Sequence, residues 1–238
     1  DARPRESDGI RAIPAGARPT VVLFADTFAT FNEPSIGRAA VAVMEAAGFD
    51  VIVPSRWCCG RPALSLGLVD VAVRGMRANL AVLAPLARAG LRIVVPEPSC
   101  ASAFRDEMPD LLTREGEHED AVLVAAAVRT LDEFIAALPP GVPSFRPGPT
   151  EAVLHVHCHQ RAHAGTGPSL AALGRIPGLA IVEPDAACCG MAGAFGFMAS
   201  HHAVSLAMAE RRLAPAVRAA PDDAVIVAPG TSCRQQIG

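Results

Sequence analysis

The sequence contains no apolar run long enough to cross a membrane, and no basic, apolar and small-residue signal segment opens it. We therefore expect a cytoplasmic protein that meets the inner membrane only peripherally, through its partners. The sequence also lacks a block of Lys and Arg, and its net charge is -3. Because phosphate contacts need a concentrated basic face, nucleic acid is excluded as a partner.

A disulfide scaffold is a further class that the sequence argues against. Its seven cysteines are an odd number, and they occur without a secretory signal. Cysteines in such a chain more often bind metal or take part in redox chemistry. The 238 residues can bury a large core, and 51% of them are apolar, as in a globular protein with buried parallel strands.

Hydrophobic patterning divides the chain into two similar α/β halves. Residues 1–19 are polar and contain three prolines, which predicts a linker, and because the chain begins with Asp1 we expect it to be a piece of a longer protein. Residues 139–150 hold too much proline for helix or sheet, and they are predicted to separate a first half, 20–138, from a second half, 151–238.

Strand-length apolar runs alternate with amphipathic helical patterns in both halves. In the first half we predict strands over 20–25, 51–54 and 91–95 and helices over 34–47, 69–88 and 119–138. In the second half we predict strands over 152–156, 179–182 and 224–228 and a helix over 201–217. This alternation implies a small parallel sheet flanked by helices in each half, with the carboxyl rims of the two sheets facing each other.

The cysteines occur in a matching order in the two halves. Cys188-Cys189-Gly190 repeats Cys58-Cys59-Gly60 at an offset of about 130 residues, and Cys233 repeats Cys100 in the same way. Each of these groups follows a predicted strand. The cysteine pattern therefore indicates an internal repeat of domain size.

The two halves differ at the first position of this pattern. The offset carries Cys158 back to Thr27, so the first half has a threonine where the second has a cysteine. Parallel strands all end at one edge of a sheet, where α/β folds bind ligands. The second half is therefore predicted to bring four thiols together on one rim: Cys158, Cys188, Cys189 and Cys233.

Four convergent thiolates suit an iron-sulfur cluster or a tetrahedral zinc ion. Structural zinc ligands usually occur as two close pairs, whereas these cysteines are 30, 1 and 44 positions apart. A vicinal pair on a glycine-rich turn favours the bulkier cluster, and zinc is the alternative. Backbone amides near Gly190 and Gly193 are expected to hydrogen-bond to cluster sulfur, which raises its reduction potential.

Histidines surround the first of these cysteines. Strand alternation predicts that His155, His157 and His159 share one side of the extended chain, with Cys158 on the other. His159 is the candidate to tune the charge of the cluster or relay a proton. Its structural alternative is a polar side chain that is simply hydrogen-bonded.

Together these motifs resemble the cysteine-rich domain of flavin- and iron-sulfur-dependent oxidoreductases. The Cys-Cys-Gly turns, Pro98-Ser99-Cys100 and His157-Cys158-His159-Gln160 carry the resemblance, which covers 20–237. That family includes the iron-sulfur proteins of glycolate oxidase, anaerobic glycerol-3-phosphate dehydrogenase and heterodisulfide reductase, and the lactate-utilisation proteins. Residues 26–28, 188–197 and 232–237 are most similar to the C-terminal part of fused FAD-linked D-2-hydroxyacid dehydrogenases, of the D-lactate or D-2-hydroxyglutarate kind.

The resemblance implies an electron-transfer part of a larger enzyme. In the fused enzymes an N-terminal FAD domain oxidises the 2-hydroxyacid, and a ferredoxin-like segment carries further clusters. By resemblance, the four cysteines of the second half ligate a 4Fe-4S cluster. In the heterodisulfide reductase relatives the motif holds a non-cubane cluster on five cysteines, one more than the second half offers.

The first half is interpreted as one that kept its fold and lost its metal. Its site of Thr27, Cys58, Cys59 and Cys100 is incomplete, because threonine is a poor ligand for iron or zinc. The alternative is a three-cysteine cluster with an open iron position. For the whole domain, the alternative functions are a zinc-stabilised or metal-free scaffold that docks the flavin domain, and a thiol-disulfide reductase.

Overall fold

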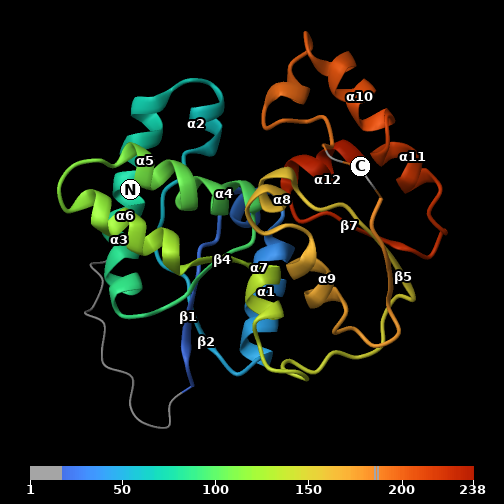
Figure 1. The fold of residues 1–238 in the computed structure, drawn as a ribbon, viewed down its shortest axis with the longest axis horizontal. Coiled ribbons are helices and arrows are strands. Elements are labelled where there is room, and N and C mark those ends of the chain that lie inside the picture. Colours follow the sequence, from blue (N-terminus) through green and yellow to red (C-terminus); the bar gives the residue numbers. More distant parts are fainter. Residues whose placement is uncertain (1–17, 185, 187) are drawn as a thin grey trace.

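The computed structural model describes residues 18–184, 186 and 188–238, and these form two parallel sheets, one from each half. The first sheet has the order β2-β1-β3-β4 and contains β1 (Thr20–Leu23), β2 (Asp50–Ile52), β3 (Ile93–Val95) and β4 (Val128–Thr130). The second has the order β6-β5-β7 and contains β5 (Glu151–Leu154), β6 (Ala180–Val182) and β7 (Val225–Val227). In both, the first strand lies between the second and the third, and Figure 1 shows the halves side by side. The predicted α/β fold of two related halves is confirmed.

The strands of the first sheet are buried on both faces, as their continuous apolar runs predict. Val22 pairs with Ile93 and belongs to the core under α3 and α6, whereas its neighbours Val21 and Leu23 belong to the core under α1 and α7. Alternate residues of a strand point to opposite faces of the sheet. Helices therefore cover both faces, and the strand ends at the carboxyl rim remain available for a site.

Helices connect successive strands in both halves (Figure 1). The first half contains α1 (Pro34–Ala46), α2 (Arg61–Ser65), α3 (Val69–Arg88), α4 (Pro98–Ser102), α5 (Met108–Leu111), α6 (Glu117–Ala127), α7 (Leu131–Ala136) and the π-helical turns η1 (Phe28–Asn32) and η2 (Ala103–Glu107). The second contains α8 (Cys158–Ala164), α9 (Gly167–Leu173), α10 (His202–Glu210), α11 (Leu213–Arg218), α12 (Thr231–Ile237) and the 3-10 turn η3 (Phe195–Phe197). Among the described residues, no helix combines the length and the apolar character needed to span a bilayer.

The single helix predicted over 119–138 is wrong, because a strand interrupts it. α6 ends at Ala127, β4 pairs with β3, and α7 begins after Thr130. Thr130 and Glu133 form a capping box, which stabilises the start of a new helix. Burial acts to raise the pKa of Glu133, but hydrogen bonds from Arg105 and Thr130 hold it below its ordinary value.

The helix predicted over 201–217 is also divided in two. α10 ends at Glu210, and α11 starts again at Leu213. Pro215 explains the break, because in a continuous helix its ring would clash with the carbonyl group four residues earlier, that of Arg211.

The predicted linker over 139–150 contains no helix or strand in the structure. Arg175 of the second half holds its beginning, donating to the carbonyl oxygens of Pro139 and Val142 at 2.9 and 3.0 Å. Residues 1–17 of the other predicted linker lie outside the described residues.

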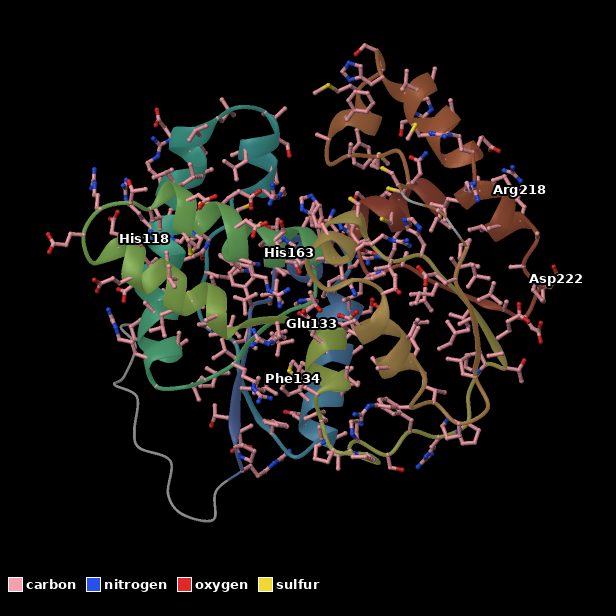
Figure 2. The ribbon with its side chains drawn as sticks, in the orientation of Figure 1. His118, Glu133, Phe134, His163, Arg218 and Asp222 are labelled. Atoms are coloured by element: carbon pink, nitrogen blue, oxygen red, sulfur yellow. The ribbon has the colours of Figure 1, made fainter. Side chains whose placement is uncertain are left out.

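Polar contacts and apolar packing join the two halves. Ala172 of α9 belongs to the same core as Phe134 of α7. His163 Nε2 lies 2.9 Å from Asp106 Oδ2, and Figure 2 shows His163 at the junction of the halves. The Arg234 guanidinium donates to Glu33 at 2.7 Å, which holds the pKa of Glu33 below its ordinary value. The rims are therefore held face to face.

Candidate metal centre

The three strands of the second sheet deliver four thiols to one rim. Cys158 is the first residue of α8, which follows β5, and Cys233 lies in α12, which follows β7. Cys188 and Cys189 lie in the loop after β6. The predicted set is thus brought to one end of the sheet. Cys158 is exposed and Cys188 half-buried, whereas Cys189 and Cys233 are buried.

Thiol-thiol contacts run through this group. Cys189 is hydrogen-bonded to Cys188 on one side and to Cys233 on the other. The bond from Cys188 lowers the pKa of Cys189, but the bond to Cys233 and burial raise it to about 11. Burial also raises the pKa of Cys158, and the bond to Cys189 raises that of Cys188. The metal-free thiols are therefore neutral near pH 7, and metal binding has to release their protons.

The turn after the vicinal cysteines depends on glycine. Gly190 has a φ of +94°, and its backbone N-H donates to Cys188 Sγ at 3.3 Å. A Cβ atom at this position would lie 2.2 Å from the Ser205 carbonyl oxygen, so only glycine fits. Gly193 has a φ of +65° and faces Ser65 of the first half. The expected amide contact with sulfur is present at Gly190 in the form of its bond to Cys188.

The histidines do not alternate as predicted, because the extended chain ends before Cys158. His157 is the N-cap residue of α8, and its Nδ1 accepts the backbone N-H of His159 at 3.2 Å. His159 lies on the helix and reaches the first half, where its Nδ1 is 2.9 Å from Ser102 Oγ. Burial lowers the pKa of His157 to about 3 and also lowers that of His159, so both rings are neutral near pH 7.

His155 occupies a different place from the other two histidines. Only 1% of its surface is exposed, and neither ring nitrogen has a hydrogen-bond partner. A ring nitrogen of His155 and the sulfurs of Cys189 and Cys233 all lie within 4.8 Å of one another. This triad is a compact set of nitrogen and sulfur donors, which suits iron or zinc.

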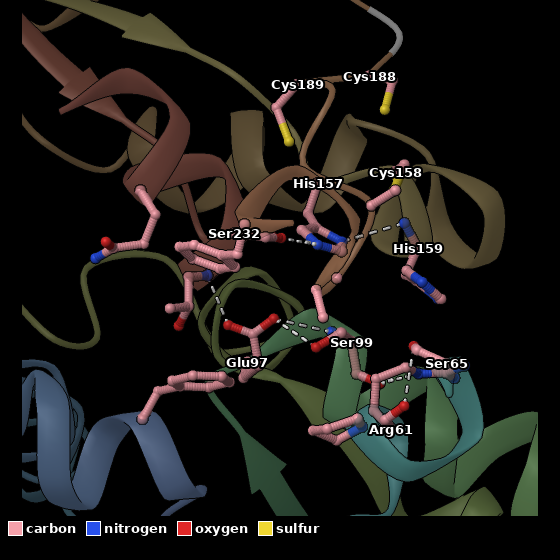
Figure 3. A pocket seen from close by; sticks show the side chains of 18 of the residues that line it. Arg61, Ser65, Glu97, Ser99, His157, Cys158, His159, Cys188, Cys189 and Ser232 are labelled. Atoms are coloured by element: carbon pink, nitrogen blue, oxygen red, sulfur yellow. Dashed lines mark hydrogen bonds between the residues drawn. The ribbon is translucent and has the colours of Figure 1, made fainter. Parts of the chain in front are cut away.

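A cavity of about 600 Å³ lies between the two rims. Cys158, Cys188 and Cys189 line it from the second half, and Glu97, Ser99 and Arg61 line it from the first. Figure 3 shows the three cysteines on one side of this cavity and the three residues of the first half on the other. The donor set thus has open space on the side that faces the first half.

Comparison with known proteins identifies this arrangement. A family model described as "CCG: Cysteine-rich domain" matches residues 25–105 and 152–238, once in each half. The chain belongs to the CCG cysteine-rich domain family. The C-type subunit of anaerobic glycerol-3-phosphate dehydrogenase from Escherichia coli K12 is 30% identical over 193 residues, which are 79% of this chain and 47% of that protein. Lactate utilization protein A of Anoxybacillus flavithermus and of Bacillus subtilis is 29% and 28% identical over 180 residues, 74% of each chain.

These relatives place the CCG domain among oxidoreductase-related proteins, and the resemblance predicted from the motifs is confirmed. Their names are those of a dehydrogenase subunit and of a protein of lactate utilisation. The chain spans about half the length of the glycerol-3-phosphate dehydrogenase subunits that it matches.

The CCG turn of the first half has a similar backbone but different surroundings. Gly60 has a φ of +95°, close to that of Gly190. Cys59 Sγ lies 2.8 Å from Cys100 Sγ, and the Thr27 hydroxyl is hydrogen-bonded to Cys58. The predicted set of one threonine and three cysteines is therefore brought together. Among the described residues, its three thiols lie outside the cavity.

Carboxyl groups disfavour thiolates in this first-half site. The hydrogen bond with Cys59 lowers the pKa of Cys100, but burial and the nearby Glu97 and Asp26 carboxylates raise it above its ordinary value. Asp26 is itself buried, with its pKa raised by that burial. A metal here would need thiolates beside two acidic groups and would lack a fourth sulfur.

The sequence reasoning overlooked His155 as a member of the second-half set. It selected His159 because that residue adjoins Cys158, whereas the structure turns His159 toward Ser102. A signal was available, since His155 ends an otherwise apolar run, 152–156, predicted to be buried on both faces. A histidine in such a position needs a partner for its ring nitrogens.

Proposed function

We propose that the second half of this CCG domain holds a 4Fe-4S cluster and transfers electrons within a larger FAD-dependent 2-hydroxyacid dehydrogenase. The observation that carries the proposal is the convergence of four thiols from three strand ends: Cys158, Cys188, Cys189 and Cys233. Sulfur donors of this kind suit iron-sulfur clusters. The cluster, when bound, supplies one-electron transfer.

The residues around the thiols fit such a group. Cys189 and Cys233 are buried on the protein side, whereas Cys158 and Cys188 face a cavity with room for a cofactor. Gly190 brings a backbone N-H to the sulfur of Cys188, and hydrogen bonds to ligand sulfur raise the reduction potential of a cluster. The neutral thiols give up their protons as they bind iron.

The electron donor in this proposal is a flavin domain of the same protein or complex. A ferredoxin-like segment with further clusters would carry electrons onward, and the assembly would work in the cytoplasm, peripherally at the inner membrane. Two observations support an oxidoreductase acting on a hydroxy compound: the names of the glycerol-3-phosphate dehydrogenase and lactate utilisation relatives, and the length of the former, about twice the matched segment.

Metal analysis of matched variants tests the cluster. Iron, sulfide and zinc are measured with a visible spectrum on anaerobically prepared wild type, Cys189→Ala and Cys59→Ala. The two cysteines are equivalent in the repeat, and 4% and 2% of their surfaces are exposed. We expect about four irons per chain in wild type and in Cys59→Ala, and loss of iron in Cys189→Ala.

The other outcomes identify the alternatives. Stoichiometric zinc, or no metal despite anaerobic handling, would contradict electron transfer and favour a scaffold that docks the flavin domain. Iron lost equally in both variants would assign metal to the first half as well. Disulfide reduction by the isolated domain would instead support a thiol-disulfide reductase.

The substrate class is tested on the full-length protein that contains this domain. D-Lactate and D-2-hydroxyglutarate are added anaerobically, and flavin and cluster absorbance are followed separately. We expect both chromophores to be reduced in wild type, and only the flavin to be reduced in Cys189→Ala. Cluster reduction by neither acid would refute the hydroxyacid assignment while leaving the cluster in place.

A further inference from the structure

A buried histidine without a partner adjoins the proposed cluster site. His155 directly follows β5, it is 1% exposed, and both its Nδ1 and Nε2 lack hydrogen-bond partners among the described residues. Most buried polar side chains in proteins are hydrogen-bonded, because leaving one unsatisfied is unfavourable. The environment of His155 therefore points to a ligand for its ring.

The surroundings of this ring consist of thiols on the side of the site. The sulfurs of Cys189 and Cys233 and a ring nitrogen of His155 lie within 4.8 Å of one another, and Cys188 is close enough to interact electrostatically. Arg161 and Glu183 are the other charged groups near the ring, and they pair with each other at 2.8 Å. The ring thus faces donors for metals and no competing hydrogen-bond partner among the described residues.

The two neighbouring histidines differ from His155 in this respect. His157 Nδ1 accepts the N-H of His159, and its Nε2 lies 3.4 Å from Ser232 Oγ. His159 Nδ1 lies 2.9 Å from Ser102 Oγ. Both rings therefore have protein partners, which makes them internal controls.

We infer that His155 is a nitrogen ligand of the metal centre in the second half, bound through one ring nitrogen beside Cys189 and Cys233. The inference rests on the proposed function, because it needs a metal there. It changes the centre from an all-sulfur to a mixed nitrogen and sulfur donor set. A neutral imidazole places less negative charge on iron than a thiolate does, so the reduction potential is higher than with sulfur alone.

Nitrogen hyperfine coupling tests this ligation without any activity measurement. Protein labelled with ¹⁵N-histidine is prepared anaerobically, reduced, and studied by pulsed EPR together with His155→Cys and the control His159→Gln. We expect strong nitrogen coupling in wild type and in His159→Gln. In His155→Cys we expect iron to be retained, the coupling to be lost, and the midpoint potential to fall.

The outcomes separate this inference from the function on which it rests. Full iron content with no strong nitrogen coupling in wild type overturns ligation by His155 and leaves the cluster standing. Weak coupling, typical of an N-H bond to sulfur, overturns it equally. Absence of iron from wild type overturns both. If His155→Cys does not fold, loss of the coupling in His157→Asn or His159→Gln still decides against His155, and its persistence in both supports it.

Discussion

Replacing Gly190 by alanine should remove iron from the second half, whereas the same change at Gly60 should not. The two glycines end equivalent CCG turns and have φ values of +94° and +95°, so alanine is strained to the same extent at both. That strain alone destabilises by roughly 1–2 kcal/mol. Any difference between the variants therefore comes from what the new methyl group meets.

At Gly60 the methyl group would meet Ala72 Cβ at 3.3 Å, a contact relieved by a few tenths of an ångström. At Gly190 it would meet the Ser205 carbonyl oxygen at 2.2 Å, so the turn or α10 has to move by about 1 Å. Overpacking adds roughly 1–3 kcal/mol, which gives about 3 kcal/mol in total for Gly190→Ala.

The movement displaces the preceding cysteines, and metal sites tolerate only small changes in ligand position. We expect iron affinity to fall about 10–100-fold in Gly190→Ala, by analogy with the loss of groups that orient ligands. Urea unfolding of the metal-free proteins measures the strain, and anaerobic iron titration measures the affinity. Equal iron loss in Gly60→Ala, or a Gly190→Ala protein with wild-type stability and iron content, would refute the reasoning.

The remaining predictions concern thiols and ion pairs. In the metal-free protein, iodoacetamide should modify exposed Cys158 well before Cys233, which is 1% exposed, as followed by peptide mass spectrometry. Because burial raises the pKa of Cys158 above 9.0, its rate should still be increasing above pH 9.0, and a plateau below that pH would contradict the raised pKa. Glu33→Gln should lower the free energy of unfolding by about 1 kcal/mol, since it weakens the bond to Arg234 between the halves, and urea unfolding at low and high salt checks this. Glu133→Gln should be destabilising at pH 7, and because the folded pKa of Glu133 is lowered, the difference should shrink as pH falls below about 4.5, which urea unfolding between pH 3 and 7 measures.

The sequence predicted best those elements that a buried surface defines. The helix expected over 69–88 matches α3 (Val69–Arg88), because Met76, Leu80 and Leu83 recur at helical spacing and are buried. The helix expected over 119–138 failed because α6 and α7 continue one apolar pattern across β4. Only the pairing of Val128 with Ile93 shows that the segment is a strand, and that contact joins residues far apart in sequence.

The site divides in the same way. The convergence of the thiols followed from parallel strands and their shared carboxyl edge, so repeat spacing was sufficient to predict it. The direction of each histidine was not predictable, because α8 begins at Cys158 and ends the alternation on which that prediction relied. Whether His155 or His159 faces the thiols depends on one backbone turn after β5, and no periodic pattern records that turn.

The first half also shapes the second-half site through Glu97, a buried carboxyl group after β3. One Glu97 oxygen accepts the hydroxyl of Ser99, and the other accepts the backbone N-H of Thr231 at 2.8 Å. Thr231 is the first residue of α12, the helix that carries Cys233. The carboxylate that disfavours a thiolate at Cys100 therefore fixes the helix of a cysteine in the other half. An acidic group so close would weaken metal binding in the first half, and its bond to Thr231 gives a physical reason for its presence there. Loss of one thiol ligand and gain of this contact both follow from the same division of roles between the repeats.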